Sequence, residues 1–357
     1  MMVFSINAHA QDLYQGQYDA SGAGEIYDLL PDEAEDIIEE FNIDLSESDW
    51  VNNLTPENIF AQIGEFIVTG MEIPLKCSAG MLAVIILIAA ASTFETFSPY
   101  SDAASYVFVL TAAAGVLMPM FSLIKSCASA VKGISTLMVG FIPLYAGILT
   151  VGGQASTASG MSFLLLFAAE AVSSLSSFVI VPLMSCYLGV GMVGSVMTTG
   201  GTNRLGEGLK KVALWVLSLS LTLFLGLLSI QTAVNKAADN LGLKAARFMI
   251  GSFVPVTGGA LSESLTTLLG SVGLLKSSVG MFAVLGIAVI VLPVVIELLI
   301  WRVVLFGLNI AADVFGVRVK TDILSAADSV LAVLIGVLLF TGVLFVISLA
   351  VIAGGQK

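Results

Sequence analysis

Long apolar runs recur along the chain from residue 79 to its end. Six of them have roughly the 20 residues that an α-helix needs to cross about 30 Å of hydrocarbon. They do not alternate apolar and polar residues, as the strands of a membrane β-barrel would. The pattern predicts an all-α polytopic membrane protein with spans at 79–97, 104–124, 161–182, 212–231, 279–301 and 329–353.

Two further apolar segments, 138–152 and 248–262, are shorter and contain helix breakers. We expect broken or re-entrant segments here, and a total of eight crossings if both cross fully. Such breakers are tolerated at membrane depth where protein or water satisfies the freed backbone groups, so they mark either a pore or close packing. The candidate residues are Gly140, Pro143, Gly147, Gly251, Pro255, Gly258 and Gly259.

The two short segments resemble each other in sequence. "MVGFIPLYAG" at 138–147 and "MIGSFVPVTGG" at 249–259 share Met, Gly, Phe, Pro and Gly in one order. At an offset of about 111 residues, Lys125 also falls on Lys236 and Pro182 on Pro293. This predicts an internal duplication with units at about 100–200 and 210–315, followed by the final helix at 329–353.

The chain before the first span is acidic. Sixteen carboxylates lie between Asp12 and Glu72, and the first basic residue is Lys76. Ala8 and Ala10 form the small-x-small pattern of a signal cleavage site, although an ordinary flexible terminus is the alternative. We therefore expect a signal remnant at 1–10, an acidic extracytoplasmic segment at 11–75, and a helical membrane domain at 76–357.

Two amphipathic helices are expected within the acidic segment. Pro31 favours a helix start, after which Ala34, Ile37, Ile38 and Phe41 share one face. Thr55 and Pro56 signal a second start. Its apolar stripe, which would lie on the membrane or pack on the protein, is Ile59, Phe60, Ile63, Phe66 and Ile67.

Composition excludes several classes of function. The chain has 57% hydrophobic and 11% charged residues and a net charge of -12, without the basic patch that nucleic-acid binding needs. Cys77, Cys127 and Cys186 are widely spaced and His9 is the only histidine, so no metal site or cofactor is expected. No phosphate-binding loop or hydrolase motif occurs, which favours a protein that is not an enzyme.

Ionisable residues inside apolar helices are functional candidates because burial of a charge in the membrane is costly. Glu170 and Glu297 are two such residues. Arg302, near the end of the same predicted helix as Glu297, is the expected ion-pair partner, and a proton relay is the alternative. Glu170 lies among small residues and is expected to hydrogen-bond across a helix interface.

The order of these features resembles the stage III sporulation protein AE family. The resemblance rests on "NAHAQD", "LLPDEAEDIIEEFNIDLSE", "LTPENIF", "MVGFIPLYAGILTVGGQ", "GGTNRLGEGLKKVALW" and "GSFVPVTGGALSES". It implies a membrane component of the channel, or feeding tube, that connects mother cell and forespore. The implied location is the mother cell's engulfing membrane, with the N-terminal segment outside.

The resemblance also implies partners. These are the other membrane proteins of the third-stage sporulation operon, its ATPase, a forespore membrane partner and membrane lipid, with self-association as a further expectation. Two other functions remain open. An ion-coupled secondary transporter or permease would use Glu170 or Glu297, and a scaffold would only assemble the channel complex.

Overall fold

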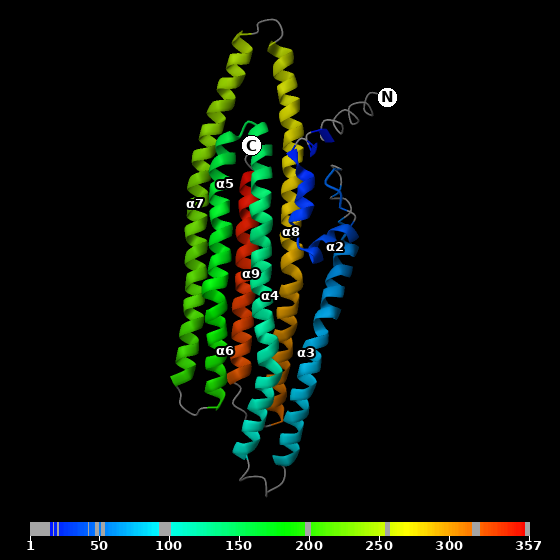
Figure 1. Ribbon diagram of the computed structural model, residues 1–357, viewed down its shortest axis with the longest axis vertical. Helices are drawn as coiled ribbons and strands as arrows, with labels where there is room; N and C mark the ends of the chain where they lie inside the picture. The colour runs from blue at the N-terminus through cyan, green and yellow to red at the C-terminus, as the bar shows by residue number, and fades with distance from the viewer. Residues whose placement is uncertain are drawn as a thin grey trace.

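The molecule is a bundle of long helices with a short N-terminal segment against its side (Figure 1). The computed structural model describes residues 15–16, 18–19, 21–41, 43–46, 50, 54–92, 101–196, 201–253, 258–315 and 322–353. The elements in these residues are η1 (Ala23–Leu29), α2 (Asp32–Glu40), α3 (Pro56–Ser92), α4 (Ser101–Val151), α5 (Ala155–Leu175), η4 (Ser176–Ile180), α6 (Val181–Val196), α7 (Gly201–Phe253), α8 (Gly258–Val314) and α9 (Asp322–Ala353).

The predicted spans are confirmed. In the described residues, six helical stretches are long and apolar enough to cross a membrane. They run alternately up and down, so that α4, α7 and α9 share one direction and α3, α5 to α6, and α8 the other (Figure 1). The six stretches are Pro56–Ala91, Ala113–Val151, Ala155–Gly194, Gly206–Gly242, Val272–Val314 and Ile323–Ile352.

Helices α5 and α6 form one continuous span through a wider turn. Pro182 lacks an N–H, and its ring crowds the carbonyl of the residue four positions earlier. The intervening η4, Ser176–Ile180, is a π-helical turn. Such a turn lengthens the hydrogen-bond ring and so accommodates the proline without ending the helix.

The predicted break in the segment 138–152 is wrong. Helix α4 continues through Pro143 and ends at Val151. The turn comes at Gly153, whose φ of 74° suits a residue without Cβ. There the Gln154 N–H donates to the Leu149 carbonyl over 2.9 Å, closing the helix end in the way of a Schellman motif.

The second segment, 248–262, is not a separate short crossing either. Gly251 belongs to α7, which ends at Phe253, and Gly258 and Gly259 begin α8. Pro255 lies outside the described residues. Six crossings, not eight, therefore account for the described helices, while the internal duplication stays a prediction.

The first amphipathic helix is confirmed as α2. Its predicted apolar face is buried, with Ala34, Ile37, Ile38 and Phe41 between 1% and 9% exposed. The second does not form a separate helix, because α3 runs without interruption from Pro56 to Ser92, through the predicted boundary at residues 75 and 76. Its predicted stripe packs on the protein only in part, because Phe66 contacts the core while Phe60 is 72% exposed.

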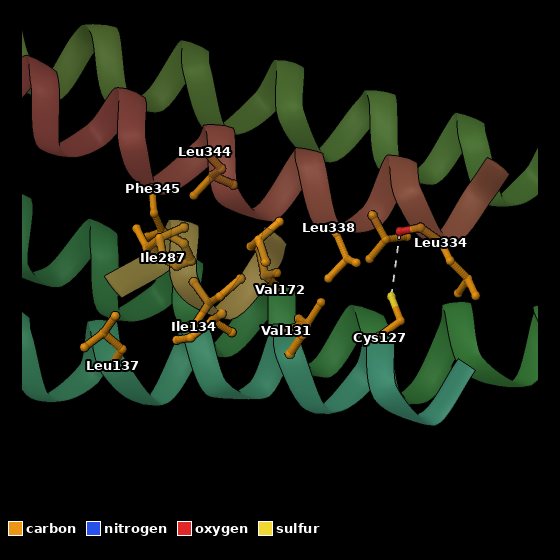
Figure 2. Packing of buried hydrophobic residues seen from close by; sticks show 14 of the residues in the cluster. Cys127, Val131, Ile134, Leu137, Val172, Ile287, Leu334, Leu338, Leu344 and Phe345 are labelled. Atoms are coloured by element: carbon orange, nitrogen blue, oxygen red, sulfur yellow. Dashed lines mark hydrogen bonds between the residues drawn. The ribbon is translucent and has the colours of Figure 1, made fainter. Parts of the chain in front are cut away.

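Helix α4 lies centrally and packs on α5, α8 and α9. Figure 2 shows its Cys127, Val131, Ile134 and Leu137 pointing toward the neighbouring helices. The Cys127 thiol donates to the Leu334 carbonyl of α9 over 3.7 Å. The interior of this part of the bundle is therefore mainly apolar, with Ser135 and Thr341 among its few buried polar side chains.

Glycine allows the N-terminal segment to approach α4. A Cβ placed on Gly140 would lie 2.4 Å from Cδ2 of Leu29, whereas a Cβ on Gly147, two turns away, would meet nothing within 4 Å. We expect Gly140→Val to destabilise docking of the segment by about 1–3 kcal/mol through overpacking. Gly147→Val should change stability by less than about 0.5 kcal/mol.

Limited proteolysis in detergent, followed by N-terminal sequencing, checks this pair. Gly140→Val should speed cleavage between α2 and α3, and Gly147→Val should not. Equal cleavage of both variants would contradict the close contact.

Candidate functional site

A stripe of polar side chains runs along the outside of α4. Lys125, Ser129, Lys132 and Thr136 are all exposed. Their spacing of four, three and four residues places them on one helix face. We call these four residues the polar stripe.

The polar stripe lies at the depth of a membrane span. Cys127 of α4 contacts Leu334 of α9, and Tyr145 of α4 and Ile352 of α9 line one small cavity. Because the two helices run in the same direction, α4 between these contacts is level with α9 between Leu334 and Ile352 (Figure 1). Ser129, Lys132 and Thr136 fall within this interval, and Lys125 lies just beyond it.

Residues from the predicted broken segment extend the same exposed face. Pro143 and Gly147 are exposed and continue the spacing beyond Thr136. Pro143 cannot donate to the carbonyl of Val139, which is itself 46% exposed. The outer face of α4 therefore carries a backbone acceptor that Pro143 cannot satisfy, as well as polar side chains.

The N-terminal segment lies beside this face at a similar depth. A Cβ on Gly133 of α4 would lie 3.6 Å from both Pro31 Cγ and Ile290 Cγ2, so these three residues meet. Ile290 is at the middle of the predicted span 279–301. Leu30 approaches Gly286 in the same span.

Helix α2 therefore brings acidic residues beside the middle of the candidate span in α8. Its sequence DEAEDIIEE has six carboxylates in nine residues. Asp36, Glu39 and Glu40 are exposed and Glu35 is half-buried. A cavity of about 270 Å³ between α2, α4 and α8 is lined by Pro31, Ala34, Ile37, Ser126, Ser129, Ala130, Gly133, Val289, Ile290, Pro293 and Val294.

The intramembrane glutamates do not lie together in a central site. Glu170 is exposed on α5, where its carboxylate accepts a hydrogen bond from the Ser174 hydroxyl over 3.2 Å. Glu297 is half-buried on α8, where α3 packs closely at Gly70. The hydrogen bond of Glu170 is within its own helix, not across an interface.

The predicted pairing of Arg302 with Glu297 is wrong. Arg302 Nε donates to Asp328 Oδ1 of α9 over 2.8 Å, and Nη2 donates to Oδ2 over 3.4 Å. Five residues along a helix are about 140° apart around its axis, so Glu297 and Arg302 point in different directions. Arg302 instead joins α8 to α9.

A double-mutant cycle checks this pair. Each side chain is 40% exposed, and we expect a coupling of about 0.5–1 kcal/mol between Arg302→Gln and Asp328→Asn. The same cycle with Glu297→Gln should show additive effects. Thermal unfolding in detergent gives the comparison, and coupling to Glu297 alone would contradict the assignment.

Sequence reasoning missed a polar cluster at the α4–α5 turn. The N–H groups of Ser156 and Thr157 donate to the two carboxylate oxygens of Asp239 over 2.8 and 2.9 Å. Lys276, only 4% exposed, donates to Gln154 Oε1 over 3.0 Å. The cluster connects the turn to α7 and α8. Its one signal in the sequence was Lys276, an isolated lysine between apolar runs.

The described residues offer little for catalysis. They contain no group of metal-ligating side chains that could hold an ion. A cavity of about 310 Å³ lies between α5, α7 and α9, and its lining is apolar apart from Ser220. The notable chemistry is therefore on the outer face of α4 and α2.

A comparison with protein families identifies the chain. The model of the stage III sporulation protein AE family matches residues 48–355. The chain belongs to the stage III sporulation protein AE family. The sporulation family match and the six apolar helices together make it a sporulation membrane protein.

One curated relative and the solved structures were also compared. The chain is 27% identical to stage III sporulation protein AE of Bacillus subtilis (strain 168) over 168 residues. That alignment covers 47% of this chain and 41% of the relative's length. No solved structure matches.

Proposed function

We propose that this chain is a non-enzymatic integral membrane component of the sporulation channel, or feeding tube, between mother cell and forespore. It would serve late forespore development from the mother cell's engulfing membrane, with its N-terminal segment outside the cytoplasm. Its partners would be other membrane proteins of the third-stage operon, the operon's ATPase and a forespore membrane protein.

The polar stripe is the observation that supports this role. Lys125, Ser129, Lys132 and Thr136 face outward from a bundle whose neighbouring helices present apolar side chains to lipid. Polar residues at membrane depth normally face protein or water rather than lipid. A chain that forms part of a larger assembly provides such surroundings, and a chain that works alone does not.

A secondary transporter is the second candidate. It would need an ionisable residue at a site that opens alternately to each side, commonly at the bilayer midplane. Glu170 lies on the outer surface and Glu297 against α3, so the two carboxylates offer no shared site. Glu170→Gln and Glu297→Gln in vesicles would abolish ion-coupled uptake only if this candidate is right.

Co-purification from sporulating cells tests the proposal. The full chain, tagged at its C-terminus, should recover the other third-stage membrane proteins and the forespore partner after engulfment. A matched variant with Lys125→Leu and Lys132→Leu should insert normally and recover the same partners, so that its effect on sporulation can be measured separately from assembly. Recovery of none by the unaltered chain, together with a need for the gene in vegetative cells, would overturn the proposal.

A scaffold differs from a channel wall in the same experiment. If the chain only assembles the complex, the lysine variant that still recovers every partner should also support sporulation. If the chain forms part of the wall, such a variant should assemble the complex yet impair forespore development.

A further inference from the structure

We propose that the polar stripe of α4 and the acidic helix α2 face a water-filled passage outside the six-helix bundle, and that α2 makes its mouth attract cations. The inference rests on the proposed function, since a channel component needs an aqueous wall. Beyond that function, the inference gives the position of the aqueous wall on the bundle and the sign of the charge that the passage attracts.

Lipid cannot surround α2 at the level of the bundle to which its contacts with α4 and α8 bring it. Pro31, directly before α2, meets Gly133 and Ile290, and Ile290 is at the middle of the span 279–301. Asp36, Glu39 and Glu40 then project from the outer side of α2. Ionised carboxylates in hydrocarbon are strongly unfavourable, so this side of the bundle must be hydrated or paired.

The polar stripe also favours water over lipid as its surroundings, because polar groups in hydrocarbon are unfavourable. A lysine near a helix end can extend its ammonium group to the interface, but the short side chains of Ser129 and Thr136 cannot. Both lie in the interval of α4 that is level with Leu334 to Ile352 of α9. Pro143 also removes one donor from the Val139 carbonyl on this face, and lipid cannot replace that donor.

Other outer faces of the bundle have the opposite character. Phe163 and Phe167 of α5 are 76% and 60% exposed, and Leu223 of α7 is 59% exposed. Leu223 and Leu344 line one cavity, which places Leu223 at the depth of the polar stripe. These faces suit lipid, so the polar face is a local feature of α4 and α2.

Charge on this face is unbalanced. The four carboxylates of α2 whose side chains are described, Glu35, Asp36, Glu39 and Glu40, outnumber Lys125 and Lys132 of the stripe. The described residues give neither lysine an ion-pair partner. A surface with excess negative charge raises the local concentration of cations and lowers that of anions.

Cysteine accessibility in liposomes tests both parts. The full chain is reconstituted with Cys77 and Cys186 replaced by alanine, while the buried Cys127 is kept. Ser129→Cys and Thr136→Cys report on the stripe, and Leu223→Cys is the lipid-facing control at similar depth. Membrane-impermeant cationic and anionic thiosulfonates are added on both sides of the liposome membrane. The rate at which each reagent modifies a cysteine is divided by the rate at which the same reagent modifies a small free thiol.

We expect both stripe cysteines to react and Leu223→Cys to stay unmodified. The normalised rate should favour the cationic reagent about 10-fold. Neutralising α2 by Glu35→Gln, Asp36→Asn, Glu39→Gln and Glu40→Gln should reduce this preference several-fold. Should that variant fail to fold, raising the salt concentration with α2 intact should reduce the preference too, since salt screens exposed charges.

Stripe cysteines that react no faster than Leu223→Cys would overturn the passage. Equal normalised rates for both reagents would overturn the cation preference alone. Failure of the proposed function is a separate result, because it appears as missing sporulation partners in co-purification. Accessible stripe cysteines without those partners would leave the passage in place and refute its assignment to the sporulation channel.

Discussion

Replacing Trp50 with alanine will release the N-terminal segment from the membrane bundle. Trp50 is 1% exposed, and its Nε1 donates to Ser278 Oγ of α8 over 2.7 Å. Its ring also meets Phe282 edge-on, with centroids 6.3 Å apart. Loss of a buried tryptophan typically costs about 3–5 kcal/mol, which is a large loss from a single side chain of the docked segment.

The effect of Trp50→Ala should be local. The six long helices pack on one another without Trp50, so circular dichroism should show nearly unchanged helix content. Limited proteolysis should instead show rapid cleavage before α3. Trp50→Phe, which retains the contact with Phe282 but not the hydrogen bond, should cost about 1 kcal/mol.

Ser278→Ala provides the matched control from the other side of the contact. If the indole hydrogen bond is made, Ser278→Ala and Trp50→Phe should cause similar, non-additive changes. Protease resistance of Trp50→Ala equal to that of the unaltered chain would show that the segment is held elsewhere.

The acidic segment shows how far the sequence could predict the structure. The spacing of Ala34, Ile37, Ile38 and Phe41 was sufficient to find α2 and its buried face. Its position was not predictable, because an acidic composition suggests a place outside the membrane. The close approach depends on Gly133, Gly140 and Gly286, whose role appears only once α4 and α8 are adjacent.

The helix breakers illustrate a second limit. An interruption was predicted at Pro143 because proline removes a hydrogen bond, yet the affected Val139 residue lies on an exposed face and the helix continues. Helix α4 ends instead at Gly152 and Gly153, because the left-handed Gly153 and the bond from the Gln154 N–H close the helix more completely. Local composition could not separate these cases.

The polar stripe could be predicted from the sequence only in part. Lys125 was recognised as a feature of a repeated unit, but the predicted span 104–124 placed it beyond the membrane. In the structure, Gly115 of α4 instead meets Met81 of α3, while α4 beyond Cys127 is level with α9. The stagger between helices, which decides depth, depends on tertiary packing that one sequence does not display.

Replacing Asp239 with alanine will have the other large effect, at the start of α5. Gln154 precedes α5 and its side chain caps no backbone N–H of that helix. Asp239 of α7 does so instead, by accepting from the N–H groups of Ser156 and Thr157 and from the Thr157 hydroxyl. Loss of these charge-assisted bonds should lower the free energy of unfolding by about 2–4 kcal/mol.

Two smaller changes separate the contributions. Asp239→Asn retains one acceptor oxygen and should cost about half as much, while Thr157→Val removes only the hydroxyl contact and should cost about 1 kcal/mol. Thermal unfolding in detergent ranks the three variants, and hydrogen exchange at Ser156 and Thr157 reports on the cap itself. The exchange measurement is decisive because a lowered melting temperature alone could come from looser packing of α7. If both amides stay protected in Asp239→Ala, another group caps α5, and the link between the α4–α5 turn and α7 does not depend on this carboxylate.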